Sequence, residues 1–419
     1  MQTRALIEPA GSAGAAGSGV GTVHTVAENL WVIEGHHPRR VWEDPDIPSI
    51  VVYHHQGTLF LLDSGVGPAM RNAVLALAAE RGRLDEVVLL NSHGHLDHLG
   101  NNAVIDAIAA RSRRHFIPAA ARPALDSRAF FGAMYRRGLS YFDYLDGLSV
   151  QPDAIRSMMI GLGASPDVTA AAVAAAGQAV LDAGLGPAIN ALIPSMVVEL
   201  LLRTYPAVDP RVAGMLDYEQ LGPARTMDID GTTRSGWSFG DGAVRVLTSG
   251  GHSAGGCVFY IQEHGFLMLA DETSTVPIWA DSNPARTAAT ARWALELVDR
   301  GSVRNVCAGH FPMLPVGGPD VRAVFERIIE AEHEFRTVVD RAVAARGGVG
   351  IDQLYADLVG SAEPGSIVAT THRLQFPVFP TFLKLTLLHQ CQLMGYPEVV
   401  DAAGTVRFSG GRPRPESRS

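Results

Sequence analysis

Four side chains of metal-ligand type stand within six positions of the run NSHGHLDHLG (91–100), namely His93, His95, Asp97 and His98. The run continues EVVLLNS (86–92), which is typical of a fully buried strand, and imidazole and carboxylate groups are costly to bury unpaired. In an extended chain His93 and His95 point the same way, and a helix beginning near Asp97 would present its first turn to the same cavity. These ligand types suit zinc and other first-row divalent ions. The run therefore predicts a metal site, and the alternative is a histidine-rich surface turn with a capping aspartate.

Three more ligand-type residues follow much later in the chain, namely His252, Asp271 and His310. His252 lies in SGGHSAGG, a glycine-rich turn after the strand-like run VRVLT, where the missing side chains leave room for a ligand. Asp271 ends the apolar run FLMLAD and His310 ends VCAGH, so each stands at the mouth of a predicted strand, where α/β proteins collect their sites. A lone residue of this kind is more often structural, but three in this order favour the metal site.

The elements that must position these residues are visible as short apolar runs. Strands are predicted at 30–35, 49–55 and 58–65, followed by a helix at 67–82 and the buried strand at 86–92. Strands return within 235–261 and 265–272 in a pattern that mirrors the first half. This alternation predicts a layered α/β core.

Two segments outside these runs are predicted to be mainly helical. Residues from about 111 to 235 are rich in alanine and methionine with proline and glycine breaks, which indicates a helical insertion. A long amphipathic helix is predicted from Asp320 to Arg346, and a later helix, strand, DAAG turn and strand resemble a winged-helix tail. We therefore expect four parts: a flexible lead at 1–25, a catalytic domain at 26–315 that includes the insertion, a helical and winged region at 316–410, and a disordered tail at 411–419.

Composition narrows the classes of partner and compartment. The formal net charge is −9 and Lys384 is the only lysine, so no basic stripe is available to grip nucleic acid. Polar residues and Pro194 interrupt the longest apolar stretch, 168–202, so buried or lid helices are expected there instead of a membrane span. The three cysteines stand far apart without a CxxC pair, and the N-terminus lacks a continuous apolar signal core. A reducing, cytoplasmic location is expected.

The ordered set LLDSG, HGHLDH, SGGHSAGG, LMLAD and CAGH, spread over positions 61–310, resembles the motif set of the metallo-β-lactamase superfamily. The resemblance implies an αββα sandwich in which two strand-rich halves pack face to face, with the metals along one edge. Two departures from the usual motifs, Asn101 and Ala270, stand where many members have glycine, and neither removes a ligand.

The resemblance also implies a role for each ligand-type residue. One metal would be held by His93, His95 and His252, and the second by Asp97, His98 and His310. Asp271 would bridge the two ions, and Asp63 would orient ligands from behind. Two divalent ions are expected, with zinc preferred and iron or manganese as alternatives.

A hydrolase is the function that this site predicts. Hydroxide generated at the metals would attack an ester, lactone, thioester or amide of a small, partly apolar substrate, with Asp97 orienting the water and moving its proton. The alternatives are a phosphodiesterase of the same fold, which the acidic charge disfavours, and an iron-dependent redox member of the superfamily. A non-catalytic scaffold is disfavoured because all seven ligand positions are filled.

The substrate pocket is the least determined part of the sequence. Phe131, Tyr135 and Tyr141 of the insertion are candidates for its apolar wall, although aromatic residues at helical spacing are more often core. His37 lies in a polar loop that could hang over the metals. The insertion is expected to form a lid over the site, a homodimer interface made of apolar helices, or both.

Overall fold

The computed structural model describes most of the chain. The described residues are 19–36, 45–145, 156, 159–160, 164–165, 167–205, 210, 213–273, 276–277, 279–315, 319–373, 381–402 and 404–410. The tail predicted at 411–419, most of the lead predicted at 1–25, and His37 lie outside them.

The first half of the chain forms one seven-stranded sheet with the order β1-β2-β3-β4-β5-β6-β7. Its strands are β1 (Val23–Ala27), β2 (Leu30–Ile33), β3 (Ile50–His55), β4 (Thr58–Leu62), β5 (Leu84–Leu90), β6 (Ala110–Ile117) and β7 (Met215–Asp217). Strands β1 to β4 pair antiparallel, and β4 to β7 pair parallel. The four strands predicted before HGHLDH are therefore present as β2, β3, β4 and β5, and they are neighbours in this sheet.

Strand β3 shows why these runs are almost continuously apolar. Val51 and Tyr53 face the second sheet, whereas Ile50 and Val52 face the helix α1 (Pro68–Glu80). Successive side chains of a strand point to opposite faces, so a strand buried on both faces needs apolar residues at consecutive positions.

The second half forms another seven-stranded sheet with the order β14-β13-β12-β11-β10-β9-β8. Its strands are β8 (Arg225–Ile229), β9 (Thr232–Phe239), β10 (Val244–Thr248), β11 (Cys257–Ile261), β12 (Phe266–Met268), β13 (Asn305–Ala308) and β14 (Phe311–Pro315). All neighbours pair antiparallel except β12 and β13, which are parallel.

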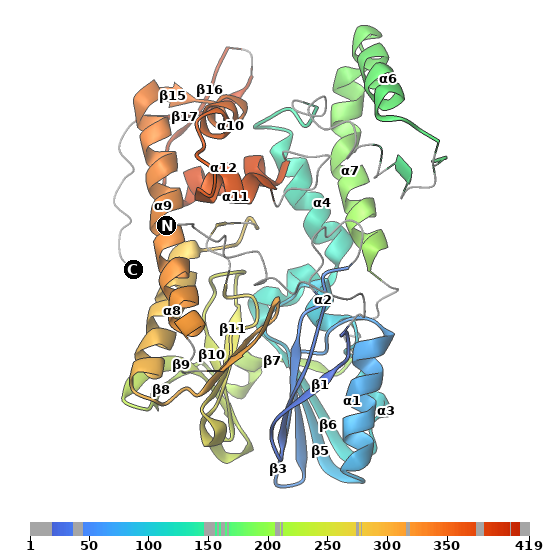
Figure 1. The fold of residues 1–419 in the computed structure, drawn as a ribbon, viewed down its shortest axis with the longest axis vertical. Coiled ribbons are helices and arrows are strands. Elements are labelled where there is room, and N and C mark those ends of the chain that lie inside the picture. The colour runs from blue at the N-terminus through green and yellow to red at the C-terminus, as the bar shows by residue number, and fades with distance from the viewer. Residues whose placement is uncertain are drawn as a thin grey trace.

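The two sheets pack face to face, and helices cover both outer faces (Figure 1). Helix α1 packs on the first sheet, while α8 (Pro284–Asp299) and the start of α9 (Pro319–Arg346) pack on the second. This arrangement confirms the expected αββα sandwich.

The helical insertion is narrower than the predicted range of about 111–235. Strand β6 occupies 110–117, β7 and β8 lie inside that range, and the first half of β9 lies at its end. The described helices between them are α4 (Ser127–Gly138), α6 (Ala170–Asp182) and α7 (Gly186–Thr204), with a short 3₁₀ helix at Ala119–Leu125. Strand β6 was not predicted because only its last three residues are buried. The residues of its first half are polar and mostly exposed, so they lack the apolar run that is typical of a buried strand.

The C-terminal part contains the predicted long helix, α9, and then a small helical unit. It comprises α10 (Ile351–Gly360), α11 (Ile367–Arg373), α12 (Thr381–Leu393) and a three-stranded sheet of β15 (Gly348–Val349), β17 (Val406–Ser409) and β16 (Glu398–Val400). The helix, strand, turn and strand predicted for a winged tail correspond to α12, β16 and β17.

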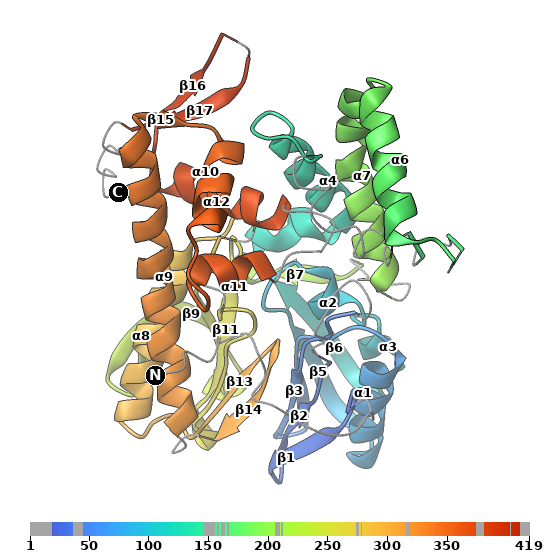
Figure 2. The ribbon, with the colours of Figure 1, turned by 45° about the horizontal axis from the view of Figure 1, so that its top comes forward.

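Helix α9 joins this unit to the sandwich. A helix of 28 residues is roughly 42 Å long, enough to serve two cores in succession. Val321 and Phe325 pack on the second sheet, whereas Phe335 and Val339 pack on the C-terminal helices and on the insertion. The insertion and the C-terminal unit thus share one apolar core and stand over the same edge of the sandwich (Figure 2).

Within the described residues, α7 alone is long and apolar enough to cross a membrane by length and composition. Ile193, Val197 and Val198 are buried in the shared core, so packing accounts for one face of the helix. Leu192 and Met196 are exposed.

Candidate metal centre

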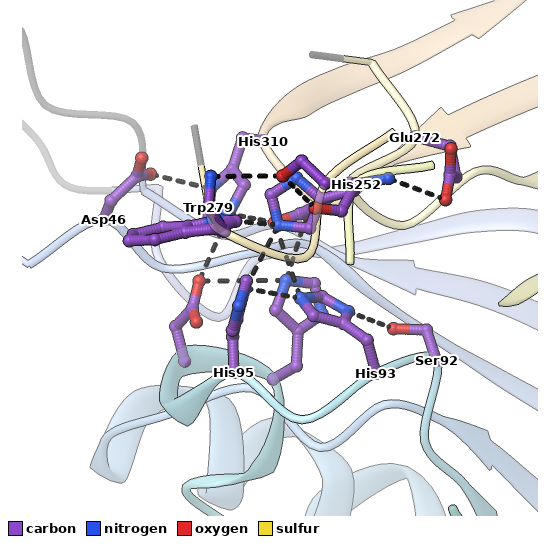
Figure 3. A network of polar contacts seen from close by, with 12 residues as sticks. Asp46, Ser92, His93, His95, His252, Glu272, Trp279 and His310 are labelled. Carbon is purple, nitrogen blue, oxygen red and sulfur yellow. Dashed lines mark hydrogen bonds and ion pairs between the residues drawn. The ribbon is translucent and has the colours of Figure 1, made fainter. Parts of the chain in front are cut away.

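All seven predicted ligand residues come together in two groups of ligand atoms, and Figure 3 shows His93, His95, His252 and His310 among them, directed toward one another. Four lie at or just before α2 (Leu96–Leu99), which begins directly after His95 as the sequence predicted. His252 follows β10, Asp271 follows β12, and His310 follows β13. Both sheets therefore contribute, each through loops at the ends of its strands.

The first ligand group contains His93, His95, His252 and Asp271. The Nε2 atom of His93 lies 3.0 Å from Nδ1 of His95, and Nε2 of His252 lies 3.1 Å from that same Nδ1. Oδ2 of Asp271 lies 3.4 Å from His252 Nε2 and 3.8 Å from His93 Nε2. Ligand atoms about 2.1 Å from a tetrahedral ion stand about 3.4 Å apart, so the group has the spacing that a zinc-sized ion needs.

The second group contains Asp97, His98, His310 and again Asp271. His310 Nε2 lies 3.2 Å from Asp97 Oδ2 and 3.3 Å from Asp271 Oδ2. His98 Nε2 lies 3.1 Å from Asp271 Oδ1 and 3.7 Å from Asp97 Oδ2. Because Asp271 belongs to both groups, its carboxylate stands between two adjacent cation sites.

Hydrogen bonds behind the ligands fix which ring nitrogen faces the centre. His98 Nδ1 lies 2.9 Å from Asp63 and His310 Nδ1 lies 2.9 Å from Asp46, so each Nδ1–H donates to a carboxylate. His93 Nδ1 is 2.9 Å from Ser92 Oγ, whose hydroxyl donates to Asp63. A ring nitrogen that donates outward leaves Nε2 deprotonated and directed inward, as a metal ligand requires. The orienting role predicted for Asp63 agrees with these contacts.

Four buried atoms of the ligand-type residues have no hydrogen-bond partner within the described part of the chain: His95 Nε2, His98 Nε2, His252 Nδ1 and Asp271 Oδ1. Of these, His98 Nε2 and Asp271 Oδ1 lie 3.1 Å apart as an ion pair. Burial opposes protonation of His98, but the carboxylates of Asp271 and Asp63 outweigh it and raise the pKa of His98 well above the usual value. Burial would likewise raise the pKa of Asp271, but His310 and His98 outweigh it and hold that pKa well below its usual value. Buried imidazole and carboxylate groups crowded together in this way cost free energy that a bound cation would recover.

Glu272 supports the first group from behind. One of its oxygens accepts the Ser249 hydroxyl at 2.7 Å and the backbone N–H groups of Gly251 and His252 at 2.9 and 3.1 Å. A side chain at Gly251 would collide with Glu272 and Thr287, which explains the glycine beside the ligand. The residue after the bridging ligand therefore holds the turn that carries another ligand.

Three aromatic rings surround His95. The ring of Trp279 lies 5.0 Å from His95 between centroids, that of Phe130 lies 6.0 Å away, and that of Phe131 lies 6.2 Å away. Trp279 also directs its indole N–H at His252 Nε2, 3.3 Å away (Figure 3). Phe131, predicted as a substrate residue, is thus at the centre.

The other predicted substrate residues occupy different places. Tyr141 stacks on Phe408, and its hydroxyl donates to Glu398 at 3.0 Å, so it contacts the C-terminal hairpin. Tyr135 is buried in the shared core, where the Tyr144 hydroxyl donates to its carbonyl oxygen. Sequence spacing placed both on an aromatic helical segment but could not indicate which distant element would cover them.

Sequence analysis missed three residues of the centre. Asp46 stands in a polar loop, Glu272 directly follows Asp271, and Trp279 is isolated in the sequence. For these three residues, the only sequence signal was that Glu272 places a second carboxylate directly after Asp271. Tyr205 is also electrostatically close, since burial raises its pKa and the carboxylates of Asp97 and Asp46 raise it further.

Comparisons with known proteins agree with this geometry. Residues 44–150 match the family model described as the metallo-beta-lactamase superfamily. A search of curated protein sequences finds no match.

Solved structures of low sequence identity also align with the chain. A metallo-beta-lactamase family protein from Thermus thermophilus is 17% identical with a TM-score of 0.45, covering 92% of this chain and 100% of that chain. A beta-lactamase domain protein from Burkholderia ambifaria is 16% identical with a TM-score of 0.46, and 95% of each chain is covered. A sec-alkylsulfatase from a Pseudomonas species is 15% identical with a TM-score of 0.46, covering 88% of this chain and 49% of that chain.

The assignment rests on the family match and on the site, because the structural similarities are too low to add to it. The matched segment contains the HGHLDH run, and the two facing sheets bring the remaining ligands to it. Residues 44–150 therefore match the metallo-β-lactamase superfamily, and this segment carries the first four of the seven ligand-type residues.

Proposed function

We propose that the protein is a dinuclear metal-dependent hydrolase that cleaves an ester, lactone, thioester or amide of a small, partly apolar substrate. The observation that carries the proposal is the shared carboxylate of Asp271, which belongs to two complete groups of ligand atoms. Zinc suits the mixture of imidazole and carboxylate donors, and iron or manganese would fit the same donors.

Two divalent ions would supply a water of lowered pKa and Lewis acids for the scissile carbonyl oxygen. The chain itself supplies a base. Asp97 borders the second group through its Oδ2 atom, 3.2 Å from His310 Nε2, and its side chain is 13% exposed against 8% for Asp271. We assign Asp97 to orient the attacking water and to pass its proton to the leaving group.

The surroundings of the ligands favour an acyl substrate over a phosphodiester. The chain carries a formal net charge of −9, so its overall field does not attract a nucleic-acid phosphodiester. On the side of His95 the neighbours are aromatic, which suits an apolar acyl or alcohol group. All three cysteines are buried free thiols, which supports action in a reducing, cytoplasmic compartment.

The test is turnover of a substrate panel by the zinc-reconstituted protein. The panel contains a carboxylic ester, a lactone, a thioester, a β-lactam and a phosphodiester. We expect hydrolysis of at least one acyl substrate, its loss on chelation, and its return with added zinc. His54→Gln is the matched control, since His54 lies on β3 outside both ligand groups and the variant should keep wild-type activity. Turnover of the phosphodiester alone, or activity confined to redox chemistry of the iron-loaded protein, would contradict the proposal.

A further inference from the structure

The indole N–H of Trp279 points at a nitrogen that a metal would use. Its Nε1 atom lies 3.3 Å from Nε2 of His252, the atom that this histidine contributes to the first ligand group. A neutral imidazole nitrogen has one lone pair, so it cannot both accept this hydrogen bond and bind an ion. With an ion bound, the indole N–H is directed at the space beside that ion, where an oxygen of a bound substrate would lie.

The same residue forms part of an apolar wall. Its ring lies 5.3 Å from that of Phe131 and 5.0 Å from that of His95 between centroids, and Phe130 lies 5.4 Å from Phe131. Trp279 and Phe130 are only partly buried, so ligand can reach them. The wall stands beside the first ligand group and is made of aromatic rings, which fits a short hydrocarbon group attached to the reacting carbonyl.

The loop that carries Trp279 is held from two sides. Its backbone N–H donates to Ser282 Oγ at 3.1 Å, and the Ser282 hydroxyl donates to the carbonyl oxygen of His252 at 2.6 Å. On the other side, Nδ1 of His389 in α12 lies 3.2 Å from the carbonyl oxygen of Pro277. A donor fixed in this way is already in place when a substrate binds, so little is lost in ordering it.

We propose that Trp279 is a substrate-binding residue: its indole N–H donates to a carbonyl or carboxylate oxygen at the first metal position, and its ring, with that of the partly buried Phe130, holds a short apolar acyl chain. This inference rests on the proposed function and narrows its substrate class to acyl compounds with an apolar chain. It also makes the C-terminal helix α12 a supporting element of the site.

Binding of product-like carboxylates to the zinc-loaded, full-length protein tests the proposal without relying on turnover. The probes are acetate and hexanoate, and their dissociation constants are measured by isothermal titration calorimetry. Trp279→Phe keeps a ring but removes the N–H, so it should weaken both probes about tenfold, the usual size of a lost hydrogen bond to a charged group. Phe130→Ala should weaken hexanoate about tenfold and leave acetate unchanged, because it removes apolar contact area at a partly exposed ring.

Trp293→Phe is the matched control. Trp293 lies on α8 and its indole N–H donates to Thr232 Oγ1 of β9, outside both ligand groups, so neither probe should bind differently. Zinc content is measured for each variant in parallel.

Each outcome decides the inference. Unchanged binding of both carboxylates by Trp279→Phe, or no binding by the wild type, overturns it. Loss of zinc from Trp279→Phe also overturns it, because the indole would then serve to hold His252. If binding depends on Trp279 as expected but the wild type hydrolyses nothing in the acyl panel, the hydrolase proposal fails while the carboxylate-binding role stands.

Discussion

The Glu272 carboxylate accepts the backbone N–H of His252 at a distance of 3.1 Å. Glu272 directly follows Asp271, so two consecutive residues serve the centre in different ways: one is shared by both ligand groups, and the other holds the turn that carries a ligand. Burial raises the pKa of Glu272, and the hydrogen bonds from Ser249, Gly251 and His252 act in the opposite direction.

Glu272→Ala should weaken metal binding at the first group by about 10- to 100-fold, the usual effect of removing a residue that orients a ligand. It leaves the hydroxyl of Ser249 and two backbone N–H groups buried without their acceptor, so the free energy of unfolding should also fall by about 3 kcal/mol. Competition with a chromogenic chelator measures the affinity. Glu272→Gln retains an acceptor oxygen and should lose less, and equal affinities in all three proteins would refute the supporting role.

Asp271→Ala and Asp97→Ala should differ in metal content. We expect about two zinc ions per chain in the wild type, about one in Asp97→Ala and fewer than one in Asp271→Ala, because only Asp271 belongs to both groups. Asp97→Ala should also lose about 100-fold or more in turnover, as expected on removal of a general base. Elemental analysis of the purified variants gives the ratios. A wild type that saturates at one ion would contradict the dinuclear arrangement.

Gly309→Ala should disturb the centre although it removes no ligand. A Cβ at this position would lie 2.4 Å from Asp271 Oδ1 and 3.0 Å from His98 Cε1, so both side chains would have to move. We expect zinc affinity to fall by about 10-fold or more, as for other changes that misplace a ligand. Gly177→Ala is the control: nothing lies within 4 Å of a Cβ built on this residue of α6. That variant should bind zinc normally and gain about 0.5 kcal/mol in stability.

His115 should make the fold acid-sensitive. Burial lowers its pKa to about 4, with Arg122 adding to the effect, whereas an unfolded chain titrates near about 6.5. Below that upper value the unfolded state takes up the proton first, so the stability that neutral His115 contributes is present above it and is lost as the pH falls toward 4. The expected loss is about 2 kcal/mol between about pH 7 and about pH 5.

Urea unfolding of the chelator-treated protein at the two pH values measures this loss. Comparison with His115→Gln isolates the contribution of His115, because titration of the ligand histidines and of His389 is common to both proteins. The variant should be less stable at the higher pH but should lose about 2 kcal/mol less on going to the lower pH. Parallel pH dependences would show that His115 is not responsible.

The sequence by itself determined the layered fold and the candidate ligand residues, because both depend on local patterns. Strands buried on two faces require unbroken apolar runs, as in β3 and β5, and α9 shows its period along its whole length. The clustering of seven ligand-type residues could be predicted because so many imidazole and carboxylate groups at strand ends have few explanations other than a cation.

Only the tertiary structure decided what surrounds those ligands. Asp46 and Trp279 carry no local signal, since a polar loop and an isolated tryptophan are common, and their roles arise from contacts with His310 and His252, which lie in other segments of the chain. Tyr141 is the opposite case, because its local signal did not indicate its contacts. Its aromatic neighbours in the sequence suggested a pocket, but in the structure it packs against a hairpin more than 250 residues further along the chain. Side-chain contacts between separate segments depend on how those segments pack in the tertiary structure. The spacing of residues along one segment does not determine which distant segment packs against it.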